Sequence, residues 1–273
     1  MDINDFFIVD NWYEVKKISL NVYCVTEPGH VSFYIFKIKN EAVFIDSGLG
    51  LCESMAKKLF RKLGIEAFDV ICTHTHCDHI GLNYLARNVY LSQKEWAKYV
   101  KQNERNQLQS YIKILKNHMQ WPNVNLDKIE YKEWKPTHFV NDGELLDFEQ
   151  HQFEIISSPG HTTGGILVYE QMTNFLYSGD LIYTGAMYLH LNDSDYNSFK
   201  NSIKHLVQIK NENTKLVIWP SHNQIPLPDE YPEKVLDFTY QYESGAKINI
   251  SSYASDDIFL EGLVLENDGV KII

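Results

Sequence analysis

Apolar and polar positions along the chain follow two different periods, which divide the sequence into strands and helices. Runs of β-branched and aromatic residues predict strands. These runs lie in residues 6–47, 68–72, 144–148, 153–157, 165–169, 175–178, 216–219 and 247–273, the last with an Asn267-Asp268-Gly269 turn. Apolar residues repeated every three or four positions predict amphipathic helices. These helices lie in residues 52–63, 78–85, 92–116, 196–209 and 229–243.

The order of these elements is strands then helices, followed by strands then helices again. Two such halves can face each other as a sheet-on-sheet sandwich with helices outside, an α/β fold. No linker or shift in composition separates the halves, so we expect one domain over residues 1–273 with a helical insertion around residues 92–136. The aromatic residues Trp121, Tyr131 and Trp134 either wall a substrate pocket or belong to an ordinary packed connection.

Composition excludes several classes of protein. The 273 residues, 44% of them hydrophobic, can bury a full core. A formal net charge of −11 disfavours nucleic-acid binding, which needs clustered Lys and Arg. No apolar run approaches the roughly 18 residues of a membrane span, and the N-terminus lacks the basic and apolar regions of a signal peptide. The four cysteines form no CxxC pair. We therefore expect a cytoplasmic protein that binds neither nucleic acid nor membrane; the sequence does not indicate its oligomeric state.

Residues 73–81 (THTHCDHIG) concentrate four potential metal ligands directly after a predicted strand. These ligands are His74, His76, Asp78 and His79. Neutral imidazole and carboxylate are what Zn²⁺ and similar divalent ions bind, and so dense a group is hard to explain as ordinary surface or core residues. Asp46 also follows a predicted strand, and it either orients a metal-bound histidine or serves as a turn or cap residue.

Three later segments share one design, in which a strand runs into a turn that presents a possible ligand. The turns are residues 158–165 with His161, residues 177–180 with Asp180, and residues 219–223 with His222. Taken alone, each side chain could be a turn residue, a helix cap or a polar strand end. Their combination with the cluster at residues 74–79 favours metal binding.

The ordered set of HxHxDH at residues 74–79 followed by His161, Asp180 and His222 resembles the metallo-β-lactamase superfamily. The resemblance extends from Asp46 to His222 and implies an αββα sandwich of two mixed β-sheets, with helices on the outer faces and metals at one edge. It implies that His74, His76 and His161 hold one metal, that Asp78, His79 and His222 hold another, and that Asp180 bridges both. This is the dinuclear, hydrolytic branch. Lactamases with Cys at the Asp180 position, and di-iron oxidases with Glu for the second His of the motif, are not matched.

The resemblance implies two divalent ions, with Zn²⁺ expected first and Mn or Fe as alternatives. The ions would share a water and lower its pKa to near 7. The resulting metal-bridging hydroxide would be the nucleophile. Asp78 or Asp180 could then receive a proton. Tyr183 lies three residues after Asp180 and either contacts the substrate oxygen, as in similar lactonases, or packs in the core. His30 is a candidate substrate contact, because in relatives its loop overhangs the metals.

The similarity to glyoxalase II and lactonases favours a small-molecule carbonyl substrate: an acyl thioester, an ester or a lactone. Thiolates and alkoxides leave more easily than amines, which suits a site without a strong general acid. The alternative enzyme is a phosphodiesterase or phosphonate hydrolase, and a β-lactamase is disfavoured because no secretion signal is found. A non-enzymatic alternative is a metal-stabilised binding module. The full ligand set argues against it, since structural sites are usually closed and cysteine-rich.

Overall fold

A computed structural model describes residues 5–27, 30–101, 112, 125, 129–245, 249–254, 261–267 and 270–273. The chain forms two compact units: unit 1 comprises Met1–Val140 with Asp147–Gln150, and unit 2 comprises Asn141–Leu146 with His151–Ile273. Several predicted features lie outside the described residues. They are most of the insertion at 92–136 including Trp121, two residues of the predicted turn at 267–269, and the two residues before His30.

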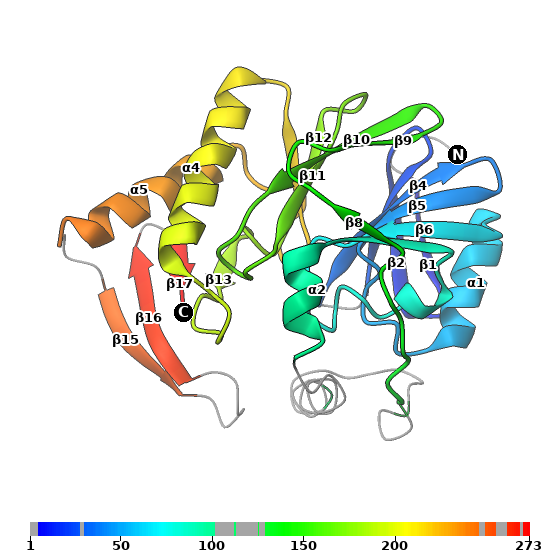
Figure 1. Ribbon diagram of the computed structural model, residues 1–273, viewed down its shortest axis with the longest axis horizontal. Coiled ribbons are helices and arrows are strands. Elements are labelled where there is room, and N and C mark those ends of the chain that lie inside the picture. Colours follow the sequence, from blue (N-terminus) through cyan, green and yellow to red (C-terminus); the bar gives the residue numbers. More distant parts are fainter. Residues whose placement is uncertain are drawn as a thin grey trace. The chain divides into compact units, whose positions relative to one another are not determined.

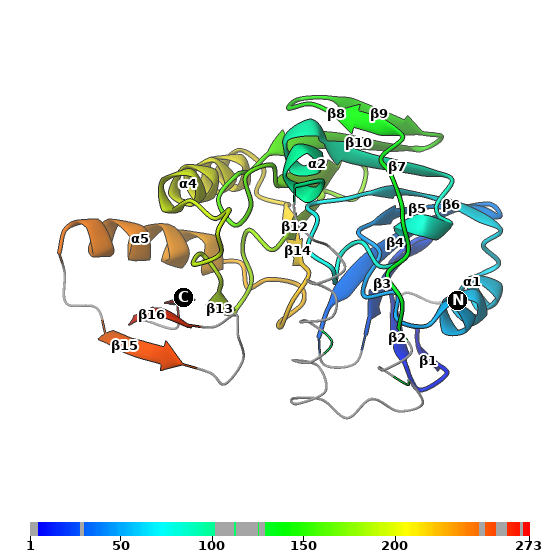
Figure 2. The same ribbon diagram turned by 60° about the horizontal axis from the view of Figure 1, so that its bottom comes forward.

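Unit 1 is built on an eight-stranded sheet whose strands lie in chain order (Figure 2). The strands are β1 (Phe6–Val9), β2 (Tyr13–Ser19), β3 (Val22–Thr26), β4 (Ser32–Ile38), β5 (Glu41–Ile45), β6 (Ala67–Ile71), β7 (Asn88–Ser92) and β8 (His138–Val140). Strands β1 to β5 pair antiparallel, and strands β5 to β8 pair parallel. Parallel pairing requires a crossover connection between strands, and the predicted ligands of unit 1 lie in the crossover between β6 and β7.

Helix α1 (Glu53–Leu63) forms over the predicted residues and packs on this sheet (Figure 1). Its buried face contains Met55, Ala56, Leu59 and Leu63. The ring of Phe60 lies 5.9 Å from that of Phe44 in β5 and 5.1 Å from that of Phe68 in β6. Gly64 ends the helix with a left-handed φ of 66°, the conformation in which glycine is favoured.

The helix predicted over residues 78–85 is wrong. This segment consists of turns and a 3₁₀ helix, η1 (Asn83–Leu85). The backbone N–H of Gly81 donates to the carbonyl of Gly48 (2.8 Å), and that of Leu82 donates to Ser47 Oγ (3.1 Å). A neighbouring loop has therefore taken the donors that a helix would pair internally. A Cβ on Gly81 would stand 2.0 Å from the Leu49 carbonyl carbon, so this close approach requires glycine.

Helix α2 (Gln93–Tyr99) is the described start of the helix predicted over residues 92–116. Ser92 caps it, with its Oγ accepting a hydrogen bond from Glu95 N (3.2 Å). Of the remaining predicted helix, the described Ile112 is helical and buried.

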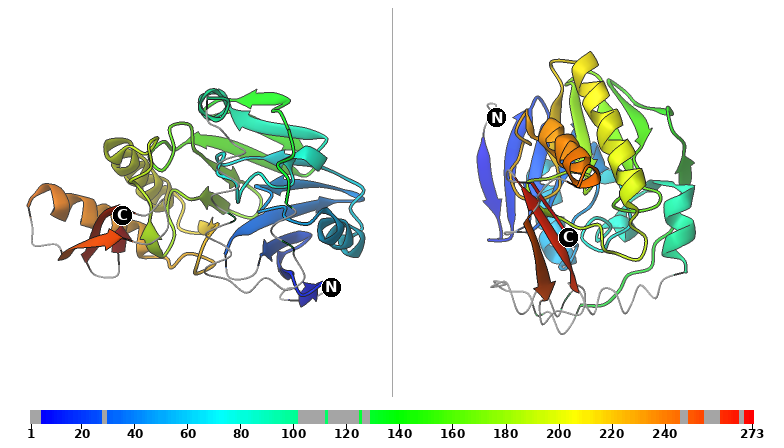
Figure 3. Two further views of the ribbon diagram at one scale, coloured as in Figure 1. Left: turned by 90° about the horizontal axis from the view of Figure 1, so that it is seen from below. Right: turned by 90° about the vertical axis from the view of Figure 1, so that its left-hand side faces the viewer.

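Unit 2 contains two sheets and two long helices, α4 (Tyr196–Glu212) and α5 (Tyr231–Glu243), which lie side by side (Figure 3). The five-stranded sheet has the order β14 (Val217–Pro220), β12 (Phe175–Gly179), β11 (Ile166–Glu170), β10 (His151–Ser157) and β9 (Leu145–Phe148). The four-stranded sheet has the order β13 (Gly185–Met187), β17 (Val270–Ile272), β16 (Glu261–Asn267) and β15 (Asn249–Ala254). The parallel pairs are β12 with β14 and β13 with β17.

One apolar core holds unit 2 together. The predicted face of α4, with Phe199, Ile203 and Leu206, is fully buried in it. Val235 and Phe238 of α5 belong to the same cluster, as do inward-facing residues of both sheets. Mixed sheets accompanied by helices confirm the predicted α/β class. None of the described helices is long and apolar enough to cross a membrane.

Candidate metal centre

The seven predicted ligands all follow the ends of strands, four in unit 1 and three in unit 2. The unit 1 cluster, which consists of His74, His76, Asp78 and His79, lies in the loop after β6. The unit 2 cluster consists of His161 after β10, Asp180 after β12 and His222 after β14. His76 and His222 are of intermediate exposure, and the other five ligands are buried.

In the unit 1 cluster, His74 and His76 direct ring nitrogens toward each other. His74 Nε2 and His76 Nδ1 are 3.1 Å apart. Two imidazole ligands of one tetrahedral zinc, each about 2.0–2.1 Å from the ion, have nitrogens separated by roughly 3.3 Å. The observed separation therefore fits two donors that share one ion. The ring of His79 lies beside them, with its centroid 4.0 Å from that of His74.

A buried carboxylate, Asp46, fixes the tautomers of two of these histidines. Asp46 Oδ2 accepts hydrogen bonds from His79 Nδ1 (2.9 Å) and from Thr73 Oγ1 (2.8 Å), and Oδ1 accepts one from Thr73 N (2.7 Å). Because the Thr73 hydroxyl proton is directed at Asp46, Thr73 Oγ1 accepts from His74 Nδ1 (3.1 Å). The hydrogen-bond network thus assigns the proton of both rings to Nδ1 and leaves Nε2 as the lone-pair nitrogen that a metal needs.

These contacts favour the interpretation in which Asp46 orients a histidine. Helix α1 has Cys52 as its N-cap, so Asp46 does not cap it. Asp46 is instead 1% exposed, with a left-handed φ of 60°, and its carboxylate faces His79 and Thr73. A residue other than glycine is held in this strained conformation only where its surroundings determine it. Its carboxylate therefore orients His79 directly and His74 through Thr73, and both histidines are predicted metal ligands.

His30 reaches the unit 1 cluster through Asp78. Its Nε2 lies 3.1 Å from Asp78 Oδ2, while Asp78 Oδ1 lies 3.7 Å from His79 Nε2. The His30 side chain is 23% exposed and that of Asp78 is 7% exposed. The histidine singled out by its loop therefore lies between solvent and a predicted ligand.

In the unit 2 cluster, the two oxygens of Asp180 face two different histidines. Asp180 Oδ1 lies 3.2 Å from His222 Nε2, and Oδ2 lies 3.6 Å from His161 Nε2. With one oxygen near each imidazole, Asp180 could share two bound cations with these histidines. His161 Nδ1 donates to the carbonyl oxygen of Tyr188 (2.9 Å), which leaves its Nε2 to face Asp180.

Tyr183 was predicted either to contact the substrate oxygen or to pack in the core. Its side chain is 3% exposed and lies in the apolar core of unit 2. Its ring also packs edge-on against His222, with centroids 5.3 Å apart. Tyr183 is therefore a core residue in contact with a predicted ligand.

The donor chemistry of both clusters fits a divalent metal ion. All seven predicted ligands offer nitrogen or carboxylate oxygen, the donors preferred by ions such as Zn²⁺, Mn²⁺ and Fe²⁺. Asp78 and Asp180 are 5% and 8% exposed. Burying carboxylates among neutral imidazoles costs free energy unless a positive charge compensates. A bound cation would supply that charge.

Two further buried carboxylates support the loops of unit 1, and the sequence did not reveal their roles. Glu95 accepts from Thr75 N (3.2 Å) and Thr75 Oγ1 (2.9 Å), and thereby holds the residue between His74 and His76. The spacing of Ser92 and Glu95 is that of a capping box, which would have been the only signal. Glu27 accepts from Leu49 N (2.5 Å), and burial raises the pKa of its carboxyl to about 7.

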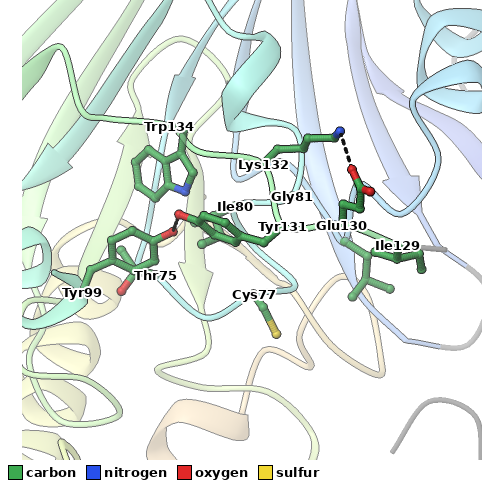
Figure 4. A pocket seen from close by; sticks show the side chains of 12 residues that line it. Thr75, Cys77, Ile80, Gly81, Tyr99, Ile129, Glu130, Tyr131, Lys132 and Trp134 are labelled. Carbon is green, nitrogen blue, oxygen red and sulfur yellow. Dashed lines mark hydrogen bonds and ion pairs between the residues drawn. The ribbon is translucent and has the colours of Figure 1, made fainter. Parts of the chain in front are cut away.

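A cavity of about 50 Å³ adjoins the unit 1 cluster loop (Figure 4). Thr75 and Cys77 line it, and so do Tyr131 and Trp134 from the aromatic segment. Trp134 also packs against the ring of Tyr99, with centroids 5.0 Å apart. The described part of this segment therefore serves as packing and as a cavity wall.

Comparisons with known proteins identify the family of the chain. Residues 26–222 match the sequence model of the metallo-beta-lactamase superfamily. Human acyl-coenzyme A thioesterase MBLAC2 is 20% identical over 230 residues, which are 77% of this chain and 81% of that protein. Hydroxyacylglutathione hydrolase GloC of Haemophilus influenzae is 25% identical over 153 residues, or 56% of this chain and 66% of that protein.

Solved structures show the same fold. The metallo-beta-lactamase family protein TTHA1429 from Thermus thermophilus has a TM-score of 0.62 at 20% identity, covering 82% of this chain and 81% of that one. This likeness confirms the predicted metallo-β-lactamase fold. The family match spans most of the chain and includes all seven predicted ligands. The chain therefore belongs to the metallo-beta-lactamase superfamily, a superfamily of hydrolases that typically bind divalent metals.

Proposed function

We propose that the protein is a metal-dependent hydrolase of acyl thioesters, with esters and lactones as related substrates. The observation that carries the proposal is the orientation of the imidazoles: hydrogen bonds at Nδ1 turn Nε2 of His74, His79 and His161 into lone-pair donors. The thioester preference draws support from the relatives. Their names give acyl-coenzyme A as the substrate of MBLAC2 and hydroxyacylglutathione as that of GloC, and both compounds are thioesters.

The proposed ligand assignment follows the superfamily resemblance. One ion is held by His74, His76 and His161, a second by Asp78, His79 and His222, and Asp180 bridges the two. The ligand set suits Zn²⁺ and also admits Mn or Fe. Within unit 2, the different directions of the two Asp180 oxygens support the bridging role.

When bound, the ions would lower the pKa of a coordinated water toward 7 and polarise the substrate carbonyl. The chain's own residues then handle the protons. Asp78 or Asp180 accepts the proton that the attacking water loses. His30 contacts the substrate or passes that proton onward, a role supported by its distance of 3.1 Å from Asp78. The Tyr183 hydroxyl donates to the developing oxyanion. A thiolate leaves without a strong acid because thiols have a pKa near 8.5.

The test is an activity panel on protein of known metal content. Acyl thioesters, p-nitrophenyl esters, homoserine lactones, a β-lactam and bis-p-nitrophenyl phosphate are compared by kcat/KM. We expect the thioesters to give the highest values. His76→Ala should abolish turnover, whereas His205→Ala, at an exposed position of α4, should not change it.

Two outcomes would contradict the proposal. Turnover of the phosphodiester alone would favour the alternative enzyme class. If metal-loaded protein hydrolysed nothing in the panel and His76→Ala altered only stability, the protein would be a metal-stabilised binding module.

A further inference from the structure

We propose that the cavity beside the unit 1 cluster loop is the subsite for a short acyl chain of the substrate. This inference rests on the proposed function and names the part of the substrate that unit 1 selects. It is carried by three properties of the cavity: its position, its size and the chemistry of its wall.

The position follows from the residues that the cavity shares with the HxHxDH motif. Thr75 and Cys77, which flank His76, line it. Ile80 and Gly81, which directly follow His79, line it as well. An occupant of this cavity therefore touches the loop that presents four predicted ligands. The four ligands are not themselves among the lining residues. The proposal therefore places the acyl chain beside their loop, with the carbonyl reaching past the loop to the ligands.

The size of the cavity limits the length of the chain. Its volume is about 50 Å³. On this measure one water-sized group needs about 10–15 Å³, so the cavity admits roughly four such groups. An acyl chain of about four or five carbons, counting the carbonyl, fills it. Longer chains would have to leave the cavity or displace its wall.

Most of the wall suits an uncharged, apolar occupant. Leu49 contributes aliphatic surface. Ile80 and Ile129 add to it, and Tyr131 and Trp134 contribute aromatic surface (Figure 4). Burial of an alkyl chain against such side chains is favourable, by about 0.8 kcal/mol for each CH₂.

Several polar groups of the wall already bond to protein, although the buried indole Nε1 of Trp134 has no hydrogen-bond partner among the described residues. The hydroxyls of Tyr99 and Tyr131 bond to each other (2.9 Å), and Thr75 Oγ1 donates to Glu95 (2.9 Å). The charges of Glu130 and Lys132 pair with each other at 3.6 Å (Figure 4). An alkyl chain can therefore displace water here without removing the hydrogen bonds of these groups.

The test is a chain-length series of acyl thioesters with one common thiol, from acetyl to octanoyl. In the natural protein, kcat/KM should rise by about fourfold per added methylene up to about four or five carbons, the gain expected from burying each CH₂. It should then level off or fall. Ile129→Trp fills the cavity and should lower kcat/KM for butyryl by about tenfold or more relative to acetyl, since two buried CH₂ groups are lost. Tyr131→Ala opens the wall and should shift the optimum to longer chains.

Val100→Trp is the matched control, because it adds the same side chain at a position that is 54% exposed and does not line the cavity. It should leave the chain-length profile unchanged. Circular dichroism and melting curves report whether each variant is folded, and Tyr131→Ala provides the test if Ile129→Trp is not.

The outcomes separate this inference from the proposed function. If the natural protein hydrolyses acetyl thioester but the folded variants change all chain lengths by the same factor, the acyl subsite is wrong and the thioesterase proposal stands. If the natural protein hydrolyses no thioester, ester or lactone, both are rejected.

Discussion

The two ligand clusters are supported in different ways. In unit 1, side chains hold the ligands: Asp46 and Thr73 orient His74 and His79, and Glu95 anchors Thr75 between the first two histidines. In unit 2, the support of His161 comes from a main-chain carbonyl, that of Tyr188. This contrast indicates which substitutions should damage each cluster. Substitution of supporting residues should damage the unit 1 cluster, whereas the unit 2 cluster should tolerate it.

Strand pairing maintains the support in unit 2. β13 pairs with β17 just before Tyr188, and Leu189 N donates to the Ile273 carbonyl (2.7 Å). The backbone around Tyr188 is therefore fixed from both sides. Substitution of a unit 2 ligand itself should still lower metal affinity. Each of these ligands follows a different strand, so no neighbouring ligand in the chain can replace it.

The largest effect is expected at Asp180, the ligand that faces both His161 and His222. Asp180→Ala leaves two imidazoles and the proposed ions without their shared carboxylate. Removing one partner from a buried charged group costs roughly 3–5 kcal/mol, or about 10²–10³-fold or more in metal affinity. Elemental analysis and competition with a chromogenic chelator measure this. Unchanged metal content would contradict the bridging role.

The next largest effect is expected on the pH dependence of stability, through Glu27, a buried side chain that supports a loop of unit 1. Burial raises the pKa of Glu27 to about 7 from an ordinary value of 4.5. Because the folded state holds this proton more tightly, the contribution of Glu27 to stability falls as pH rises from 4.5 to about 7. The free energy of unfolding lost over this pH range is about 3 kcal/mol.

Glu27→Gln removes this titration. Urea unfolding at a series of pH values from about 5 to about 8 should show the natural protein losing stability relative to the variant as pH rises, with most of the change complete just above about pH 7. If the free energies of unfolding of the two proteins changed in parallel over this pH range, Glu27 would not titrate as its burial implies.

A smaller loss is expected from Asp46→Asn, which keeps the shape of the side chain and changes the hydrogen bonds that orient His79 and His74. Loss of such a supporting carboxylate costs about 10–100-fold in metal affinity. Thr73→Val removes the acceptor of His74 Nδ1 and one donor to Asp46. It should lower metal affinity by less, because the hydrogen bond from His79 to Asp46 remains. Asp69→Asn is the control: Asp69 is also buried in unit 1 but pairs with Arg87. It should lower stability without lowering metal affinity.

The smallest effect is expected from Tyr188→Ala. Its carbonyl, which accepts from His161, survives the substitution. Metal affinity should therefore stay within about threefold of the natural protein, far from the loss at Asp46. If Tyr188→Ala and Asp46→Asn lost metal affinity equally in the same titration, the proposed difference between the two clusters would be wrong.

The sequence predicted the parts of the site that depend on local spacing. The four ligands of residues 74–79 are close together in the chain, and the strands that deliver all seven ligands are apolar runs that remain apolar in the core. The strands β4 and β5 and the helices α1, α4 and α5 could be predicted for the same reason.

Features that depend on contacts between residues far apart in the chain could not be predicted from local sequence patterns. The segment at residues 78–85 has a helical pattern, but Ser47 and Gly48 take its backbone donors. Glu27 carries no local signal, since its partner Leu49 is 22 residues away. The carbonyl of Tyr188 carries none either, because every residue has one.

The most direct test of the central claim is thioester turnover measured against metal content in one preparation. Metal-free protein is titrated with Zn²⁺, and kcat/KM for a short acyl thioester is recorded at each metal-to-protein ratio. The account predicts that activity rises with loading and reaches its maximum at two ions per chain. Full activity at one ion would contradict the dinuclear site, and no activity at two ions would contradict the hydrolase itself.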